Sequence, residues 1–231
     1  MKRIKPSDGI YHVYNRGVEK RDIFTKDGDR MRFLYSLIIF NSTEDADNER
    51  HYFEPNFSNL TEVGLRYSDQ KKLVKIHAFV LMRNHYHLMI EQVEDNGITT
   101  FMRKLGTGYT NYFNKKYERV GALFQGKYKA IILEEQRQFL YLPYYIHLNP
   151  LDVVEPEWKN GKINNLKNAL KFLETYKWSS HLDYLGEKNF PSILDTNMLS
   201  EFYGNESRYR EGIEEWIREN SYQEFEDISL D

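Results

Sequence analysis

The sequence predicts an α+β fold with a central antiparallel sheet and helices packed on one face. Three observations support it: an alternating segment near the start of the chain, an apolar hairpin in the middle, and segments with helical spacing around them. Alternation with a period of two is typical of half-buried strands, whereas apolar residues three or four positions apart indicate an amphipathic helix. With 231 residues, the chain can form one large domain or one domain with a small appendage.

The first strand is predicted over residues 10–18, where side chains alternate until a glycine ends the run. A helix follows over residues 29–40, with apolar residues at helical spacing and with Asp27 or Asp29 available as its N-cap. The next stretch is polar and shows little periodicity. It is predicted to be an insertion at about residues 41–66.

A β-hairpin is predicted from residues 73–82, a buried strand, and residues 85–92, which return antiparallel after a short turn. Successive side chains of a strand point to opposite faces. The second strand therefore has two different faces: Tyr86, Leu88 and Ile90 face the core, and His85, His87 and Met89 face another layer.

The remaining predicted elements are a helix over residues 98–117, a strand over residues 123–134, a helix over residues 135–148 that Pro150 stops, and a helix over residues 164–175. The order strand–helix–strand–strand–helix–strand corresponds to a ferredoxin-like split βαβ arrangement. We therefore expect one domain over residues 1–186, which includes the insertion, and an acidic C-terminal extension over residues 187–231.

Composition limits the chemistry and the location of the protein. The chain contains no cysteine, which excludes disulfides, thiolate zinc sites and cysteine nucleophiles. No apolar run approaches the roughly 18 residues that span a bilayer, and the basic N-terminus lacks the apolar segment of a secretory signal. We expect a cytoplasmic, nucleoid-associated protein with no membrane partner.

Charge is distributed unevenly, although the net charge of −3 by itself argues weakly against nucleic-acid binding. Residues 99–129 contain seven Lys and Arg against one acid, whereas residues 201–231 contain ten acids against three arginines. Tyr and Phe interleave with the basic residues of the first segment, as in surfaces that neutralise phosphates and stack unpaired bases. The alternative is an amphipathic helix with core aromatics and solvated lysines.

The residues most suggestive of chemistry are two histidines of the hairpin. His85 and His87 occupy positions i and i+2 of a strand, so both imidazoles can point at one ion. This pattern alone is a weak signal, because two histidines also occur on solvated strand faces.

A second cluster lies about sixty residues later, on the helix that precedes Pro150. At 100° per residue around the helix axis, Asn149 lies about 40° from Tyr145 and about 140° from Tyr144. His147 lies about 200° from Tyr145. Tyr145 and Asn149 therefore share a face, and His147 is more readily structural. Two imidazoles, a carboxamide and a phenol could form a metal site beside a tyrosine nucleophile, a combination that suggests phosphodiester chemistry on nucleic acid.

The motifs Asn84-His85-Tyr86-His87-Leu88 and Tyr145-Ile146-His147-Leu148-Asn149-Pro150 resemble those of the single-tyrosine HUH transposases, most closely the REP-associated tyrosine transposase branch. Supporting stretches start at Tyr11, Tyr109, Gly121 and Trp178. The resemblance covers about residues 8–186. The insertion and the acidic extension lie outside it.

The resemblance implies a single-stranded DNA endonuclease and strand transferase that forms a 5′-phosphotyrosine intermediate. The HUH pair falls on His85 and His87, the nucleophile on Tyr145, and the third metal ligand on Asn149, where relatives carry Gln or Asn. Tyr86 is larger than the usual aliphatic residue between the histidines, but it would still point to the core. The ligand set suits Mg²⁺ or Mn²⁺, and its imidazoles slightly favour Mn²⁺.

Candidates for contacts to the DNA backbone are basic residues: Arg103, Lys104, Lys127, Lys129 and, at the end of the first strand, Arg16. For Arg16, a surface arginine beside a turn is an equally good interpretation. The expected partner is single-stranded or hairpin DNA, and the expected assembly is a monomer or homodimer.

Three other functions remain open from the sequence. The chain could be a domesticated nucleic-acid binder without activity, or a metal-dependent nuclease with water as its nucleophile and a structural Tyr145. Its acidic extension could also act as a DNA mimic in an interaction protein.

Overall fold

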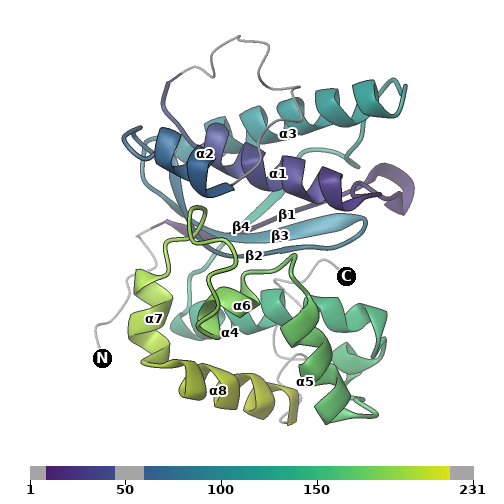
Figure 1. The fold of residues 1–231 in the computed structure, drawn as a ribbon, viewed down its shortest axis with the longest axis vertical. Helices are drawn as coiled ribbons and strands as arrows, with labels where there is room; N and C mark the ends of the chain where they lie inside the picture. The colour runs from purple at the N-terminus through teal and green to yellow at the C-terminus, as the bar shows by residue number, and fades with distance from the viewer. Residues whose placement is uncertain (1–8, 45–59, 219–231) are drawn as a thin grey trace.

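The computed structural model describes residues 9–44 and 60–218, and its centre is an antiparallel sheet (Figure 1). The sheet has four strands in the order β2-β3-β1-β4, and every paired neighbour is antiparallel. Their bounds are Ile10–Arg16 for β1, Val74–Leu81 for β2, His85–Gln92 for β3 and Lys129–Ile132 for β4. The predicted α+β fold with a central antiparallel sheet is confirmed.

Helices α1 (Asp27–Ile39) and α3 (Gly97–Lys116) cover one face of this sheet (Figure 1). Each connects two strands, so the chain follows the predicted βαββαβ order. Their apolar sides meet the strand residues that alternate onto the same face, with Phe33, Phe101, Tyr86 and Leu88 all buried in one core cluster. A short helix, α2 (Leu60–Arg66), lies beside α1 in this layer.

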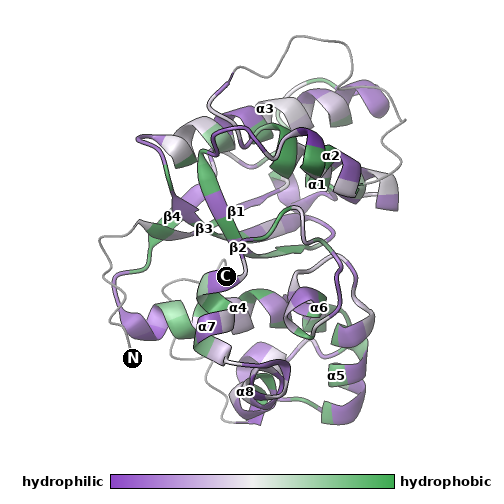
Figure 2. Ribbon diagram, turned by 60° about the vertical axis from the view of Figure 1, so that its left-hand side comes forward, coloured by the Kyte–Doolittle hydropathy of each residue, from purple (hydrophilic) through white to green (hydrophobic). Residues whose placement is uncertain are grey.

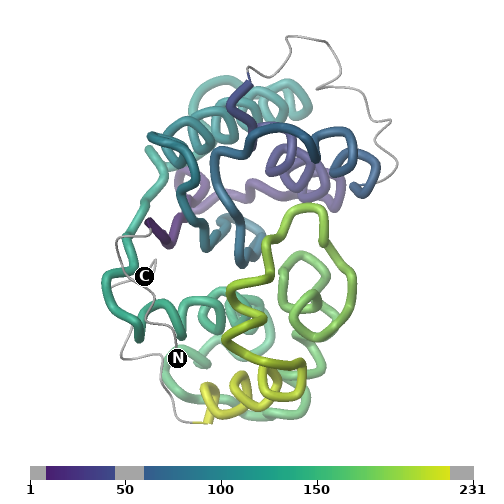
Figure 3. The backbone as a smooth tube through the Cα atoms, turned by 90° about the vertical axis from the view of Figure 1, so that its left-hand side faces the viewer, coloured from purple at the N-terminus to yellow at the C-terminus, as the bar shows by residue number. Residues whose placement is uncertain are grey.

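The other face of the sheet is covered as well, by the helices that follow β4 (Figures 1 and 3). They are α4 (Gln136–Leu148), α5 (Leu166–Thr175), α6 (His181–Tyr184), α7 (Asn197–Tyr203) and α8 (Glu206–Arg218). Of these, α4 lies against β2 and β3. The prediction of helices on one face thus describes α1 and α3, and a second helical layer adds to it.

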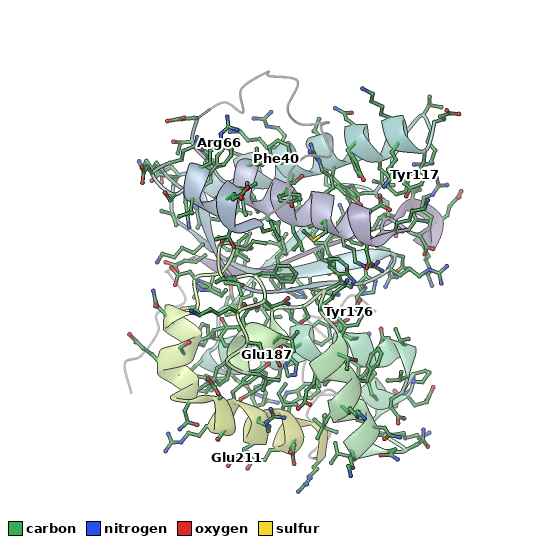
Figure 4. The ribbon with its side chains drawn as sticks, viewed as in Figure 1. Phe40, Arg66, Tyr117, Tyr176, Glu187 and Glu211 are labelled. Atoms are coloured by element: carbon green, nitrogen blue, oxygen red, sulfur yellow. The ribbon has the colours of Figure 1, made fainter. Side chains whose placement is uncertain are left out.

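Helices α7 and α8 belong to the segment predicted as an acidic extension, and both contribute to the second core cluster. Leu199, Tyr209 and Trp216 are buried there together with apolar residues of α4. Most acids of α8 are exposed, and Glu211 lies on its outer side (Figure 4). Figure 2 shows hydrophobic segments in the sheet and in the helices on both of its faces. The domain boundary at residue 186 and the role of the extension remain predictions.

Two predicted boundaries differ from the structure. The strand predicted over residues 123–134 is divided into an isolated bridge, in which Phe124 pairs with Gly17, and the strand β4, because the chain bends between Phe124 and Lys129. Beyond α4, residues Asn149–Val153 continue as a 3₁₀ helix, since Pro150 in the first turn needs no intrahelical N–H partner. Residues 45–59 of the predicted insertion lie outside the described residues. No helix within residues 9–44 and 60–218 is long and apolar enough to cross a membrane.

Candidate active site

Strand alternation and register gather polar rings on the face of the sheet that α4 covers. His85 and His87 of β3 point to this face, whereas Tyr86 and Leu88 point to the α1–α3 core. On the neighbouring strand β1, Tyr14 pairs with His87 and Arg16 pairs with His85. Directly opposite residues of antiparallel strands share a face, so the basic end of β1 lies beside the two histidines.

A third histidine, His12, completes the ring cluster from β1. Its Nε2 lies 2.8 Å from Nδ1 of His87, and the two rings stack with centroids 5.1 Å apart. The rings of His85 and His87 are also 5.1 Å apart and nearly perpendicular, at 89°. Sequence reasoning did not single out His12. Its position on the same strand face as Tyr14 and Arg16 is a signal, but only the pairing of β1 with β3 brings it to His87.

Tyr145 reaches this cluster from α4. Its ring packs edge-on against His87, with centroids 5.4 Å apart, and against His12, with centroids 5.8 Å apart. The side chain is 1% exposed. Tyr144, in contrast, stacks on Tyr209 of α8 on another side of the helix.

Asn149 begins the 3₁₀ turn one helical turn after Tyr145, and its side chain folds back onto that residue. The Nδ2 group donates a 2.7 Å hydrogen bond to the backbone carbonyl of Tyr145. Because a carbonyl only accepts, the amide nitrogen faces it and Oδ1 faces away. This oxygen is buried and has no hydrogen-bond partner.

The donor atoms of the predicted ligands fit a divalent cation. Nδ1 of His85 lies 2.6 Å from the amide oxygen of Asn84, which only accepts, so Nδ1 carries the hydrogen and Nε2 keeps its lone pair. Nε2 of His87, like Oδ1 of Asn149, is buried without a hydrogen-bond partner. Leaving such atoms unsatisfied costs about 1–3 kcal/mol each, which a bound cation would offset.

The surroundings of His87 favour the neutral form of its imidazole. Burial lowers the pKa of His87 well below its ordinary value, with His12 and His85 as the next causes and Lys159 and Arg16 adding to the effect. Neutral imidazole is the form that binds a metal. Within the described residues no group of three or more His, Cys, Asp or Glu is placed to hold a metal ion, so the candidate set depends on the amide of Asn149.

The predicted DNA-contacting residues divide between two faces of the sheet. Lys129 pairs with Tyr14, which pairs with His87, so these three residues form one row across the site face. Lys127 is exposed in the preceding loop, and Arg16 lies opposite His85.

Arg103 and Lys104 are not brought to this row. Both belong to α3, on the other face of the sheet, and Nζ of Lys104 donates to the backbone carbonyls of Ser42 and Glu44 at 2.9 and 2.7 Å. Lys159, on a 3₁₀ turn after α4, supplies a positive charge that lowers the pKa of His87 and that sequence reasoning missed.

His147 lies on the side of α4 away from the site, where it contacts Ser180 and Tyr209. Its Nε2 is 2.7 Å from Oγ of Ser180, its Nδ1 is 2.7 Å from the hydroxyl of Tyr209, and that hydroxyl is 2.7 Å from Nδ1 of His181. Burial, followed by the charge of His181, lowers the pKa of His147 well below its ordinary value. This buried network joins the tyrosine-bearing helix to α8.

Comparison with known proteins finds a family that part of this chain resembles. Residues 46–149 match the model described as "Transposase IS200 like", and the matched segment contains His85, His87, Tyr145 and Asn149. A solved structure titled "Structure of the REP associates tyrosine transposase bound to a REP hairpin" is 11% identical, covers 85% of this chain and 92% of its own, and has a TM-score of 0.47. No curated protein matches the chain. Residues 46–149 are therefore similar to the IS200-like transposases.

Proposed function

We propose that this protein is a metal-dependent single-stranded DNA endonuclease and strand transferase that forms a 5′-phosphotyrosine intermediate at Tyr145. The observation that carries the proposal is the contact between strand β3 and the C-terminal turn of α4. The ring of Tyr145 packs on His87, while Asn149, one turn later, holds a buried amide oxygen with no hydrogen-bond partner. The match of residues 46–149 to the IS200-like transposase model supports a DNA-processing role for these residues.

His85, His87 and Asn149 would hold the cation, Mg²⁺ or Mn²⁺, through two imidazole nitrogens and one amide oxygen. When bound, the ion supplies Lewis-acid polarisation of the scissile phosphate. The three protein ligands leave coordination positions for phosphate oxygens and water, and the two nitrogens slightly favour Mn²⁺.

Tyr145 would attack the phosphorus atom through its phenolic oxygen. The new P–O bond joins the DNA 5′-phosphate to the tyrosine, the bond from phosphorus to the 3′ oxygen breaks, and the proton lost by the phenol balances the one gained by the released 3′-OH. A free phenol has a pKa of about 10, so the phenolate needs positive charge nearby. Lys159 and Arg16, whose charges act on the neighbouring His87, would supply it. Because the linkage conserves the bond energy, a 3′-OH can reverse the step and join strands without ATP.

The DNA strand would lie along the row that Lys129, Tyr14 and His87 form across the sheet, with Lys127 and Arg16 beside it. Cationic side chains there neutralise phosphates, and the ring of Tyr14 offers a surface for an unpaired base. Arg103 and Lys104, on the opposite face, are proposed contacts only for DNA beyond the scissile segment.

A second candidate is a metal-dependent nuclease that uses water, with Tyr145 as a structural residue. The burial of Tyr145, which is 1% exposed, favours it, because substrate reaches the hydroxyl only after covering residues move.

The deciding experiment incubates the protein with a pool of end-labelled single-stranded hairpins and Mn²⁺, followed by a denaturing gel. The proposal expects a covalent protein–DNA band from wild type and none from Tyr145→Phe. Cleavage by Tyr145→Phe would support water as the nucleophile. DNA binding without cleavage by wild type would instead indicate a domesticated binder.

A further inference from the structure

The contact between His12 and His87 has a direction, and that direction decides whether His87 can bind a metal. We propose that His12 is a positioning residue that accepts a hydrogen bond from Nδ1 of His87 and thereby holds the lone pair of His87 on Nε2. The inference deepens the proposed function and rests on it, since His87 is a proposed metal ligand.

The geometry permits two arrangements of one hydrogen atom. Nε2 of His12 and Nδ1 of His87 lie 2.8 Å apart, so one ring nitrogen donates and the other accepts. If His87 donates, its Nε2 carries a lone pair. If His12 donates, Nε2 of His87 carries a hydrogen and has no lone pair to offer to a cation.

Burial alone does not choose between the two arrangements, because the second ring nitrogen of each histidine, Nε2 of His87 and Nδ1 of His12, is buried. The choice follows from the proposed role of His87. A lone pair on its Nε2 is a ligand atom that a cation would satisfy, whereas a hydrogen on that atom would exclude the cation. The first arrangement is therefore the one that metal binding by His87 requires.

The neighbouring ligand follows the same pattern. Nδ1 of His85 faces the amide oxygen of Asn84, an acceptor that fixes the lone pair of His85 on Nε2. Each proposed imidazole ligand thus has a hydrogen-bond acceptor for its Nδ1–H. Asn84 of the turn serves His85, and His12 of the adjacent strand serves His87. Such partners orient metal-bound histidines, and their loss typically weakens metal affinity 10- to 100-fold.

The position of His12 suits this role. Its side chain is buried, and its ring is stacked on that of His87 at an interplanar angle of 17°. The hydrogen bond uses its Nε2, so that nitrogen is not offered to the same ion as His87. It acts through His87.

The test reads the tautomer in the full-length protein without metal or DNA. Histidine labelled with ¹⁵N and long-range ¹H–¹⁵N correlation spectra report which ring nitrogen of His87 carries the hydrogen. Wild type is expected to be protonated on Nδ1 alone. His12→Phe keeps a stacked ring but removes the acceptor, and should give a mixture of tautomers and about 10-fold weaker Mn²⁺ binding by calorimetry.

Two further variants make the result specific. His12→Gln keeps an acceptor on a flexible side chain and should restore most of the Nδ1 tautomer and of the Mn²⁺ affinity. His77→Phe is the matched control: it removes a buried histidine of β2 whose ring nitrogens contact Asp195 and Glu91 instead, and Mn²⁺ affinity should not change.

Protonation of His87 on Nε2 in wild type would overturn the inference, and so would equal Mn²⁺ affinity in wild type and His12→Phe. If His12→Phe fails to fold, the wild-type tautomer and the affinity of His12→Gln decide. Failure of the proposed function would appear separately, as the absence of a covalent adduct from a wild-type protein whose tautomer is as expected.

Discussion

The side-chain nitrogen of Asn149 lies 2.7 Å from the backbone carbonyl oxygen of Tyr145. This hydrogen bond ties a proposed ligand to the helical turn that carries the proposed nucleophile. It also fixes the orientation of the amide, because only the nitrogen can donate to the carbonyl, so the oxygen is turned toward the buried interior. Metal binding by this oxygen would couple α4 to the hairpin that carries His85 and His87.

Asn149→Ala should therefore separate metal binding from DNA binding. We expect Mn²⁺ affinity to fall about 10-fold or more and metal-dependent cleavage to be lost, while affinity for single strands changes little because phosphate contacts lie elsewhere. Calorimetric titration of Mn²⁺ and a filter-binding assay measure the two quantities. Asn149→Gln, which retains an amide oxygen, is the matched control. Equal Mn²⁺ affinity in wild type and Asn149→Ala would exclude the residue as a ligand.

Tyr209→Phe should destabilise the fold by about 2–4 kcal/mol, because it leaves buried nitrogens of His147 and His181 without their hydrogen-bond partner. Urea denaturation measures the free energy of unfolding. Tyr203→Phe is a close control, since the hydroxyl of Tyr203 is buried without a hydrogen-bond partner and its removal should leave the free energy of unfolding unchanged or raise it. Similar losses in both variants would show that the network contributes little.

Stability should fall as the pH is lowered below about 6.5. Burial, with a smaller contribution from Arg210, lowers the pKa of His181 to about 3. Below the unfolded-state pKa the unfolded chain binds a proton that the folded chain does not, so His181 contributes stability above pH 6.5 that is lost toward pH 3, at about 1.4 kcal/mol per pH unit. His181→Asn should make the measured dependence shallower. An unchanged slope between pH 6.5 and 4 would contradict this assignment.

Single-stranded DNA affinity should decrease steeply with salt, and replacement of Lys127 and Lys129 by Ala should make the slope shallower by about 1.4, or roughly 0.7 per phosphate contact. The paired variant is Arg103→Ala with Lys104→Ala. It should change the slope less, because α3 lies on the other face of the sheet and Lys104 already donates to two carbonyls. A larger effect of the α3 pair would place the strand on that face.

Local patterns predicted the two strands of the hairpin and the two faces of β3. Period-two alternation alone separates Tyr86 from His85 and His87, and the structure has that separation. Helical angles likewise place Tyr145 and Tyr144 on different sides of α4. These features depend only on the geometry of one element, which the chain determines over a few residues.

Features that depend on distant segments could not be predicted in this way. His12 joins the site only through the register of β1 against β3, which no local pattern specifies. The acidic composition after residue 186 concealed the apolar side of α8, although Tyr209 and Trp216 are spaced like core residues. Arg103 and Lys129 belong to one basic segment of the sequence. In the structure, Arg103 lies on α3 at one face of the sheet, and Lys129 lies on the edge strand β4.

The most direct test of the proposed chemistry is to map the covalent adduct. Wild-type protein would be incubated with a single-stranded hairpin and Mn²⁺, digested with protease and nuclease, and analysed by mass spectrometry. We predict a nucleotide phosphate on Tyr145 alone, the tyrosine of α4 whose ring contacts His87. A nucleotide on Tyr144 or Tyr141, or strand cleavage with no modified tyrosine, would contradict the account.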